Sequence, residues 1–432
     1  MSNTKQVYIQ VNAENIASNG TASYSGGNPI VRFSLGEREM HLIPSSIRLS
    51  GQIACFYNSA QAGSLSASNL NISNKLGAMG VVEQIQIASQ RTKQTIEHIT
   101  HVDRLYSSLE TIRSSEQDYC SPFNNERLVV PNKFLQEKVV SNPTTKNTPS
   151  TFCIPLICGF TAGSDLCPLS AVNGVGGIEI TLSLASNSSF FYNSSLTPST
   201  DMDSAFYELS NLQIFAEGII SSDGSPLPVI NELDYISINS YYETINSTNA
   251  TINMPLAKSR VLGVFANFMP SSYINNRDFD GTQCRPPLNS DGTVAKISQL
   301  TFTKGGVRLP LQYNISTIHR DQNTDSCDAQ ILYNYINGIT SFVNLNRTNI
   351  NNLNTNCVNG ATDKLVRELG NLYGIGVSFT NISRDGIDFM NESFGVQIDL
   401  DLTSDNPNSV FLFAVNRQTI TFNSQNGIMV SN

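Results

Sequence analysis

His98 and His101 are the first candidates for chemistry, because they lie three residues apart in the stretch Glu-His-Ile-Thr-His-Val-Asp. Two imidazoles at this spacing on a helix share one face and could bind one zinc ion. A charged, solvated helix face produces the same pattern without any further ligand. We therefore expect no metal at these two residues.

Cysteine is the second candidate, because thiolates bind metals and act as nucleophiles. Cys153, Cys158 and Cys167 lack the Cys-X2-Cys spacing of a zinc site, and the first two flank an apolar strand. The chain shows no compact disulfide framework, so we predict buried free thiols. The eight cysteines are Cys55, Cys120, Cys153, Cys158, Cys167, Cys284, Cys327 and Cys357.

A run of acidic and amide residues resembles the start of a calcium-binding loop, with Asp321, Asn323, Asp325 and Asp328 at ligand spacing. The motif is incomplete, because Ser326 stands where the loop needs glycine and Leu332 where it needs a bidentate glutamate. A solvated acidic loop is the better interpretation.

Motifs for catalysis are also weak. Gly-Val-Gly-Gly at 174–177 precedes a predicted strand, whereas a dinucleotide fingerprint follows a strand and opens a helix, so we predict a turn. None of the four histidines stands beside a serine in an elbow motif. Asp399 and Asp401 share one strand face and could form a glycosidase pair, although a wet strand face is far commoner. We therefore predict no catalytic residues, no cofactor and no enzymatic activity.

The secondary structure that would position these candidate residues is predicted to consist mainly of β-strands. The stretch GVGGIEITLSLAS at 174–186 alternates apolar and polar side chains, which is typical of a half-buried antiparallel strand. The pattern recurs in FGVQIDLDL at 394–402, where Val396 stands 218 residues after Ile178.

Further features repeat in the same order at a similar offset, which indicates duplication of a whole domain. A short alternating strand in each half is followed by a polar turn and then by a stretch with apolar residues at helical spacing. A later strand also has a counterpart in the second half. The pairs are 83–88 with 298–303, 96–113 with 328–339, and 152–160 with 370–378.

Length and composition favour two all-β sandwiches of roughly 200 residues each. Charged residues make up only 14% of the 432, and Gly, Pro, Asn, Ser and Thr supply many turns. The segment SSDGSPLP at 221–228 is the natural linker, so we predict domains at 1–222 and 223–432. Long loops are expected at 114–149 and 270–293. Other strands are predicted at 7–12, 29–35, 41–57, 177–185, 206–220, 235–245, 250–269 and 409–423.

The charge pattern excludes some partners. A formal charge of -9 and the lack of a Lys/Arg stripe argue against broad or sequence-specific contact with nucleic acid. The beginning MSNTKQVYIQ has no apolar core of the secretory type, and no stretch reaches the length of a membrane span. We expect a protein that stays in a reducing compartment.

The order of elements in the first half resembles the double jelly-roll major capsid proteins of nucleocytoplasmic large DNA viruses, virophages and Polinton-like viruses. Ile154-Pro155-Leu156, then Gly159-Phe160, Pro168-Leu169 and Gly177 with its strand resemble one passage of that family. The 84–96 hairpin, the helix after it and the strand at 206–220 resemble others. The likeness covers most of the first half and, more faintly, the second.

This resemblance implies two tandem eight-stranded antiparallel jelly rolls with short helices and long loops. It also implies a pseudo-hexagonal homotrimer that tiles an icosahedral shell in the virion. The implied partners are further copies of the chain, neighbouring capsomers, penton and minor capsid proteins, and an internal membrane in some viruses. A carbohydrate-binding or carbohydrate-cleaving jelly roll is the alternative, although the absence of Trp removes the usual aromatic platform.

Overall fold

The structure is a computed structural model of the 432-residue chain. The residues that it describes are 4–17, 20–25, 28–57, 70–73, 76–113, 149–163, 165–172, 174–193, 205–276, 286–290, 295–309, 315–316, 329–342, 373–380, 382–402, 406–423 and 427–431.

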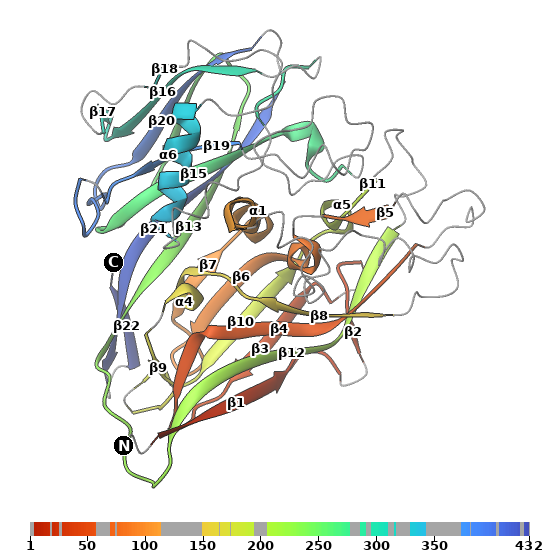
Figure 1. Ribbon diagram of the computed structural model, residues 1–432, viewed down its shortest axis with the longest axis vertical. Helices are drawn as coiled ribbons and strands as arrows, with labels where there is room; N and C mark the ends of the chain where they lie inside the picture. Colours follow the sequence, from red (N-terminus) through yellow and green to blue (C-terminus); the bar gives the residue numbers. More distant parts are fainter. Residues whose placement is uncertain are drawn as a thin grey trace.

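Two antiparallel sheets face each other in the first half of the chain (Figure 1). Their main paths run β1-β12-β4-β8 and β3-β10-β6-β7. The first path contains β1 (Thr4–Asn12), β12 (Ala205–Ser221), β4 (His41–Tyr57) and β8 (Ser150–Pro155). The second contains β3 (Ile30–Leu35), β10 (Ile178–Leu184), β6 (Val82–Ser89) and β7 (Thr95–Ile99).

The second half repeats this arrangement, with main paths β13-β21-β15-β19 and β14-β20-β16-β17. The first path contains β13 (Glu232–Ile245), β21 (Asn408–Asn423), β15 (Val261–Pro270) and β19 (Gly374–Ser378). The second contains β14 (Asn249–Met254), β20 (Phe394–Asp401), β16 (Lys296–Lys304) and β17 (Val307–Arg308). Each half is therefore a sandwich of two sheets, each with a main path of four strands, and the strands follow the same order in both halves. This confirms the predicted pair of eight-stranded jelly rolls.

Smaller elements lie around the two sandwiches. The short strands are β2 (Thr21–Ala22), β5 (Leu70–Ile72), β9 (Cys167–Pro168), β11 (Phe191–Asn193), β18 (Ile315–Ser316) and β22 (Gly427–Ser431). Within the described ranges, the α-helices are α1 (Val102–Arg113), α4 (Gly159–Ala162), α5 (Asn187–Phe190) and α6 (Ala329–Thr340), and 3-10 turns cover Gly77–Val81 and Ser271–Tyr273. None of the helices described is long and apolar enough to cross a membrane.

The repeated strands β10 and β20 correspond with a different number of residues between equivalent positions than the 218 predicted from the sequence. Ile178 pairs with Ser89 in the first sandwich, and Phe394 pairs with Lys304 in the second. These equivalent pairs place the repeat of Ile178 at Phe394, 216 residues later, and not at Val396. A shift of two residues keeps every side chain on the same face of the sheet, so alternation alone could not set the register.

Two other predictions were wrong in detail. The predicted helix at 96–113 begins only at Val102, because residues 95–99 form strand β7 and pair with β6. His101 has a φ of 56°, and this left-handed residue separates the strand from the helix. The final strand β22 was missed, since its five residues carry too little periodicity to be recognised.

The apolar core is divided unequally between the sandwiches. A smaller cluster fills the interior of the second sandwich and includes Phe268, Val396 and Leu412. The larger cluster fills the first sandwich and continues onto the outer face of β15 and β21, where it includes Phe265 and Phe413. The two jelly rolls are thus joined by a shared core.

Candidate functional site at the junction of the two sandwiches

Glu97 lies at the centre of the junction between the sandwiches. Its carboxylate is buried in β7 and accepts hydrogen bonds from three backbone N–H groups. Two come from helix α4 of the same sandwich, Gly159 N at 3.0 Å from Oε1 and Phe160 N at 2.7 Å from Oε2. The third comes from Ile238 N on strand β13 of the second sandwich, at 2.9 Å from Oε1. One side chain therefore satisfies backbone donors from both jelly rolls.

Burial of this carboxyl group shifts its titration into the neutral range. Desolvation raises the pKa of Glu97 to about 7, against the opposing effect of the hydrogen bonds from Phe160, Ile238, Cys158 and Gly159. The same carboxyl group contributes, after burial, to the raised pKa values of Cys158 and Tyr235. Glu97 thus changes its charge close to physiological pH within a wholly buried contact.

Gly159 lets the two sandwiches approach closely. A Cβ atom at this position would lie 1.9 Å from the carbonyl oxygen of Ile236 on β13 and 2.6 Å from Oε1 of Glu97. No side chain fits in that space, so glycine is required by the backbone-to-backbone contact. The requirement belongs to the junction rather than to helix α4, because β13 is part of the other sandwich.

Polar contacts flank Glu97 on both sides. The Tyr235 hydroxyl lies 2.7 Å from the carbonyl oxygen of Ile96, and Thr100 N donates to Ser240 Oγ at 3.0 Å. Both contacts join β13 to the β7 segment. A cleft of about 450 Å³ opens beside Glu97, and its lining also includes Gln94, Thr95, Ile96, His98, Ser237, Ile238, Asn239, Lys258, Gln418 and Val430.

Asn267 links three further elements at the junction. Its Nδ2 donates to the Arg104 carbonyl oxygen at 3.0 Å and to Ser108 Oγ, both on α1, and its Oδ1 accepts from the Tyr335 hydroxyl on α6. Asn267 itself lies on β15 and is buried. A buried amide with all these bonds fixes the register of α1 against the second sandwich.

The structure separates the two histidines that could have shared a metal ion. His98 is exposed on strand β7, while His101 packs against Phe411 and Tyr242 with ring centroids 5.0 and 5.7 Å away. They do not share a helix face, so the placement of both histidines on one solvated helix face was wrong: His98 lies in β7, and His101 precedes α1. Among the residues described, no three His, Cys, Asp or Glu side chains gather in a way that could hold a metal ion.

The cysteine prediction is confirmed for three residues. Cys55, Cys158 and Cys167 are buried free thiols, and burial raises the pKa of each above its usual value. Cys153 is also free but only partly buried. The other four cysteines, Cys120, Cys284, Cys327 and Cys357, lie outside the described residues.

Among the residues that the structure describes, the remaining sequence candidates do not gather into a site. Gly176 and Gly177 have φ values of 65° and 80° and form a turn before β10, as predicted. Asp399 and Asp401 lie on the solvent side of β20, where Asp399 stands opposite Asn249. The acidic stretch from Asp321 to Asp328 lies outside the described residues.

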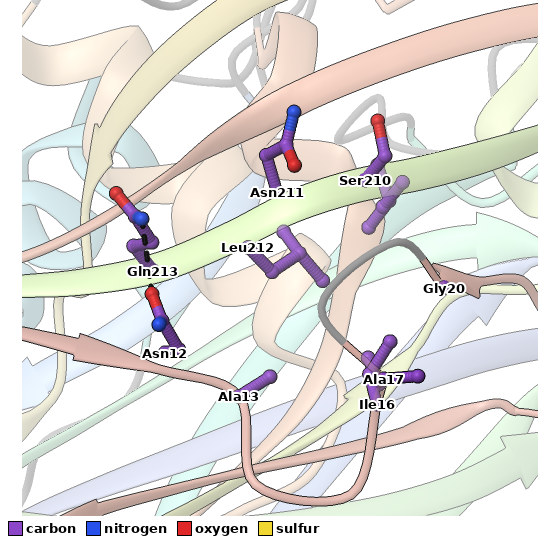
Figure 2. Close-up of a pocket in the computed structure, with 10 residues that line it drawn as sticks. Asn12, Ala13, Ile16, Ala17, Gly20, Ser210, Asn211, Leu212 and Gln213 are labelled. Atoms are coloured by element: carbon purple, nitrogen blue, oxygen red, sulfur yellow. Dashed lines mark hydrogen bonds between the residues drawn. The ribbon is translucent and has the colours of Figure 1, made fainter.

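A small hollow lies where β1 ends against β12 (Figure 2). Its volume is about 130 Å³, and Gln213 Nε2 donates to Asn12 Oδ1 at its rim at 3.0 Å. It has neither a charged group nor an aromatic surface, so it offers no acid, base or sugar-stacking platform. The lining residues are Asn12, Ala13, Ile16, Ala17, Gly20, Leu209, Ser210, Asn211, Leu212 and Gln213.

Sequence reasoning missed the junction, because it placed Glu97 on a charged, solvated helix face. Glu97 is instead buried in a strand, between Ile96 and Ile99, which are also buried. The one available signal was a single acidic residue in a short apolar run, and such a residue needs hydrogen-bond partners when it is buried.

Comparison with known proteins gives structural matches only. No protein-family model matches the sequence, and neither does any curated protein. A chain of the capsid of the virus PBCV-1 superimposes with a TM-score of 0.58 at 9% identity, covering 100% of this chain and 97% of that one. A chain from the structure of the Sputnik virophage gives 0.54 at 12% identity, with coverage of 99% and 88%. The Faustovirus major capsid protein gives 0.54 at 8% identity, with coverage of 98% and 91%. The chain therefore has the double jelly-roll fold of these structures over its whole length.

Proposed function

We propose that this chain is a major capsid protein, and that its role is structural rather than catalytic. The observation that carries the proposal is the double jelly roll itself. One chain contains two eight-stranded sandwiches with the same strand order, and a shared apolar core joins them. The full-length likeness to the Faustovirus major capsid protein and to a PBCV-1 capsid chain supports it.

The proposed building block is a homotrimer. Three chains with two similar sandwiches each would present six nearly equal sides, and a body with six nearly equal sides can tile a surface. In this proposal the capsomers pack against one another and against penton and minor capsid proteins, over an internal membrane in some viruses. The protein then resides in the virion.

We place the boundary between the two jelly rolls at residues 222 and 223. The support for this boundary is that strands up to β12 pair among themselves and strands from β13 onward pair among themselves. Residues 222–231, which connect β12 to β13, lie at the same end of the molecule as the N terminus (Figure 1).

Light scattering coupled to size-exclusion chromatography tests the proposal on the purified full chain. We expect a particle of three times the 47.2 kDa chain mass. Electron microscopy in negative stain should then show hexagonal capsomers. A stable monomer that is retained on a glycan column would instead favour a carbohydrate-binding protein and would overturn the proposal.

A further inference from the structure

The cleft beside Glu97 is lined by both jelly rolls. Strand β7 of the first supplies Thr95 and His98, and strand β13 of the second supplies Ser237. Lys258, which lies between β14 and β15, also lines it. The cleft has a volume of about 450 Å³, which is within the range of sites that hold small molecules.

Contacts across the junction fix the shape of this cleft. The Tyr235 hydroxyl on β13 lies 2.5 Å from Gln418 Oε1 on β21. With its amide nitrogen turned toward β22, Gln94 donates to the Ile428 carbonyl oxygen at 2.5 Å and accepts from Val430 N at 3.2 Å. Side chains of the cleft are therefore held in place before a ligand binds, which lowers the entropy cost of binding.

The charge that the cleft offers to a ligand is positive. Among its described lining residues, Lys258 and His98 are basic and Glu97 is acidic. Both carboxyl oxygens of Glu97 already accept backbone N–H groups of the junction. Lys258 is partly buried, and the loss of water lowers the pKa of its ammonium group. An anion beside Lys258 would offset this desolvation, in a chain whose formal charge is otherwise -9.

Uncharged donors share the lining with Lys258, namely the Thr95 and Ser237 hydroxyls and the Asn239 amide. Asn239 Nδ2 donates to Asn416 Oδ1 at 2.5 Å, and Asn416 stands opposite Ser237 in the pairing of β13 with β21. Asn416 is buried, and its Nδ2 has no hydrogen-bond partner among the described residues. A buried donor without an acceptor costs free energy. This wall of the cleft is thus short of hydrogen-bond acceptors.

We propose that the cleft binds a phosphate group, either as inorganic phosphate or as the monoester of a small molecule. A phosphate group carries negative charge and several strong acceptor oxygens, which match one ammonium group and several neutral donors. A carboxylate has fewer oxygens and would leave more of these donors unpaired. In a monoester, the rest of the molecule would contact the apolar lining residues Ile96, Ile238 and Val430.

A phosphate bound here would contact both jelly rolls and stabilise their junction. Because it binds only the folded protein, it should raise the melting temperature as its concentration rises. The site lies within one chain, so it is independent of the proposed capsid role.

Calorimetric titration of the full chain tests the site with inorganic phosphate and with glycerol phosphate at constant ionic strength. We expect saturable binding of one phosphate group per chain. Lys258→Met should weaken this binding about tenfold or more, because a hydrogen bond between charged groups is lost. Thr95→Val removes an exposed donor, keeps nearly the same shape and should weaken binding by less. Lys5→Met, at an exposed lysine on β1, removes the same charge outside the cleft and should leave binding unchanged.

Each outcome of the titration decides for or against the site. Tighter binding of glycerol phosphate assigns the site to a monoester, and equal binding of both ligands assigns it to the free anion. No binding to the unaltered chain overturns the inference, as does equal weakening by Lys258→Met and Lys5→Met, which would show general charge attraction. Circular dichroism verifies the fold of each variant, and Thr95→Val keeps the test decisive if Lys258→Met does not fold. The particle mass, which tests the capsomer, does not enter these outcomes, so the two proposals fail separately.

Discussion

Glu97 Oε1 accepts a hydrogen bond from Ile238 N at 2.9 Å, and so ties strand β7 of the first jelly roll to the edge of strand β13 of the second. An unpaired strand edge inside a protein must find acceptors for its N–H groups. Here one carboxylate does this while it also holds the first turn of α4. The relative placement of the two sandwiches thus depends on a small set of buried contacts, which can be altered one at a time.

Replacing Gly159 with Ala should destabilise the protein. The new Cβ atom would meet the Ile236 carbonyl oxygen at 1.9 Å, so β13 must move away from α4. Overpacking of this kind costs about 1–3 kcal/mol or more. Thermal melting would measure the loss. Gly163→Ala is the matched control, because its nearest neighbour would lie at an ordinary 3.7 Å. Equal melting temperatures for both variants would contradict the close approach.

Replacing Glu97 with Leu should destabilise the protein more than the same replacement at His98, the next residue on the strand, because Glu97 is buried and His98 is exposed. The substitution removes the acceptor for Gly159, Phe160 and Ile238 N–H, and each buried donor left unpaired costs about 1–3 kcal/mol. His98→Leu, on the exposed face of the same strand, should change the free energy of unfolding little. Denaturant titration measures both. If the two variants unfold at the same denaturant concentration, Glu97 does not hold the junction.

The free energy of unfolding should fall with rising pH because of Glu97. Its pKa is raised from 4.5 to about 7 in the folded protein, so between these values the folded state binds a proton that the unfolded state has lost. The contribution of this group is fully present below pH 4.5 and is lost as pH rises through about 7. The size is about 3 kcal/mol.

Glu97→Gln isolates this effect, since glutamine has the same shape and no charge. Unfolding free energies of both proteins would be measured in steps from pH 4.5 to 8. The unaltered protein should lose about 3 kcal/mol relative to the variant across that interval. A constant difference between the two proteins would show that Glu97 does not titrate there.

The cysteines should differ in reactivity according to burial. Thiol alkylation depends on access and on the thiolate fraction, and burial reduces both for Cys55, Cys158 and Cys167. We expect these three to stay unmodified in the folded protein and to react fully in denaturant. Partly buried Cys153 should react first of the four. Mass spectrometry of peptides after timed alkylation gives each rate separately, and early labelling of Cys158 would contradict its place in the junction.

The sequence alone determined the long alternating strands, their duplication and the fold class, but not the short strands β7 and β22. Apolar residues on alternate positions, as in Ile178 to Leu184, mark which face of a strand is buried, and this signal is local. The boundaries of β4 at His41–Tyr57 were predicted to the residue for the same reason. Buried thiols at Cys55 and Cys167 also followed from their apolar surroundings.

Only the tertiary structure decided how the two sandwiches meet. The register of a strand depends on the strands with which it pairs. The alternating pattern is the same whether Ile178 corresponds to Val396 or to Phe394, so only the pairing in the structure identified Phe394. Burial of Glu97 depends on Gly159, 62 residues away, and on Ile238, 141 residues away. No periodicity connects such residues, because the contact exists only once both jelly rolls have folded and packed.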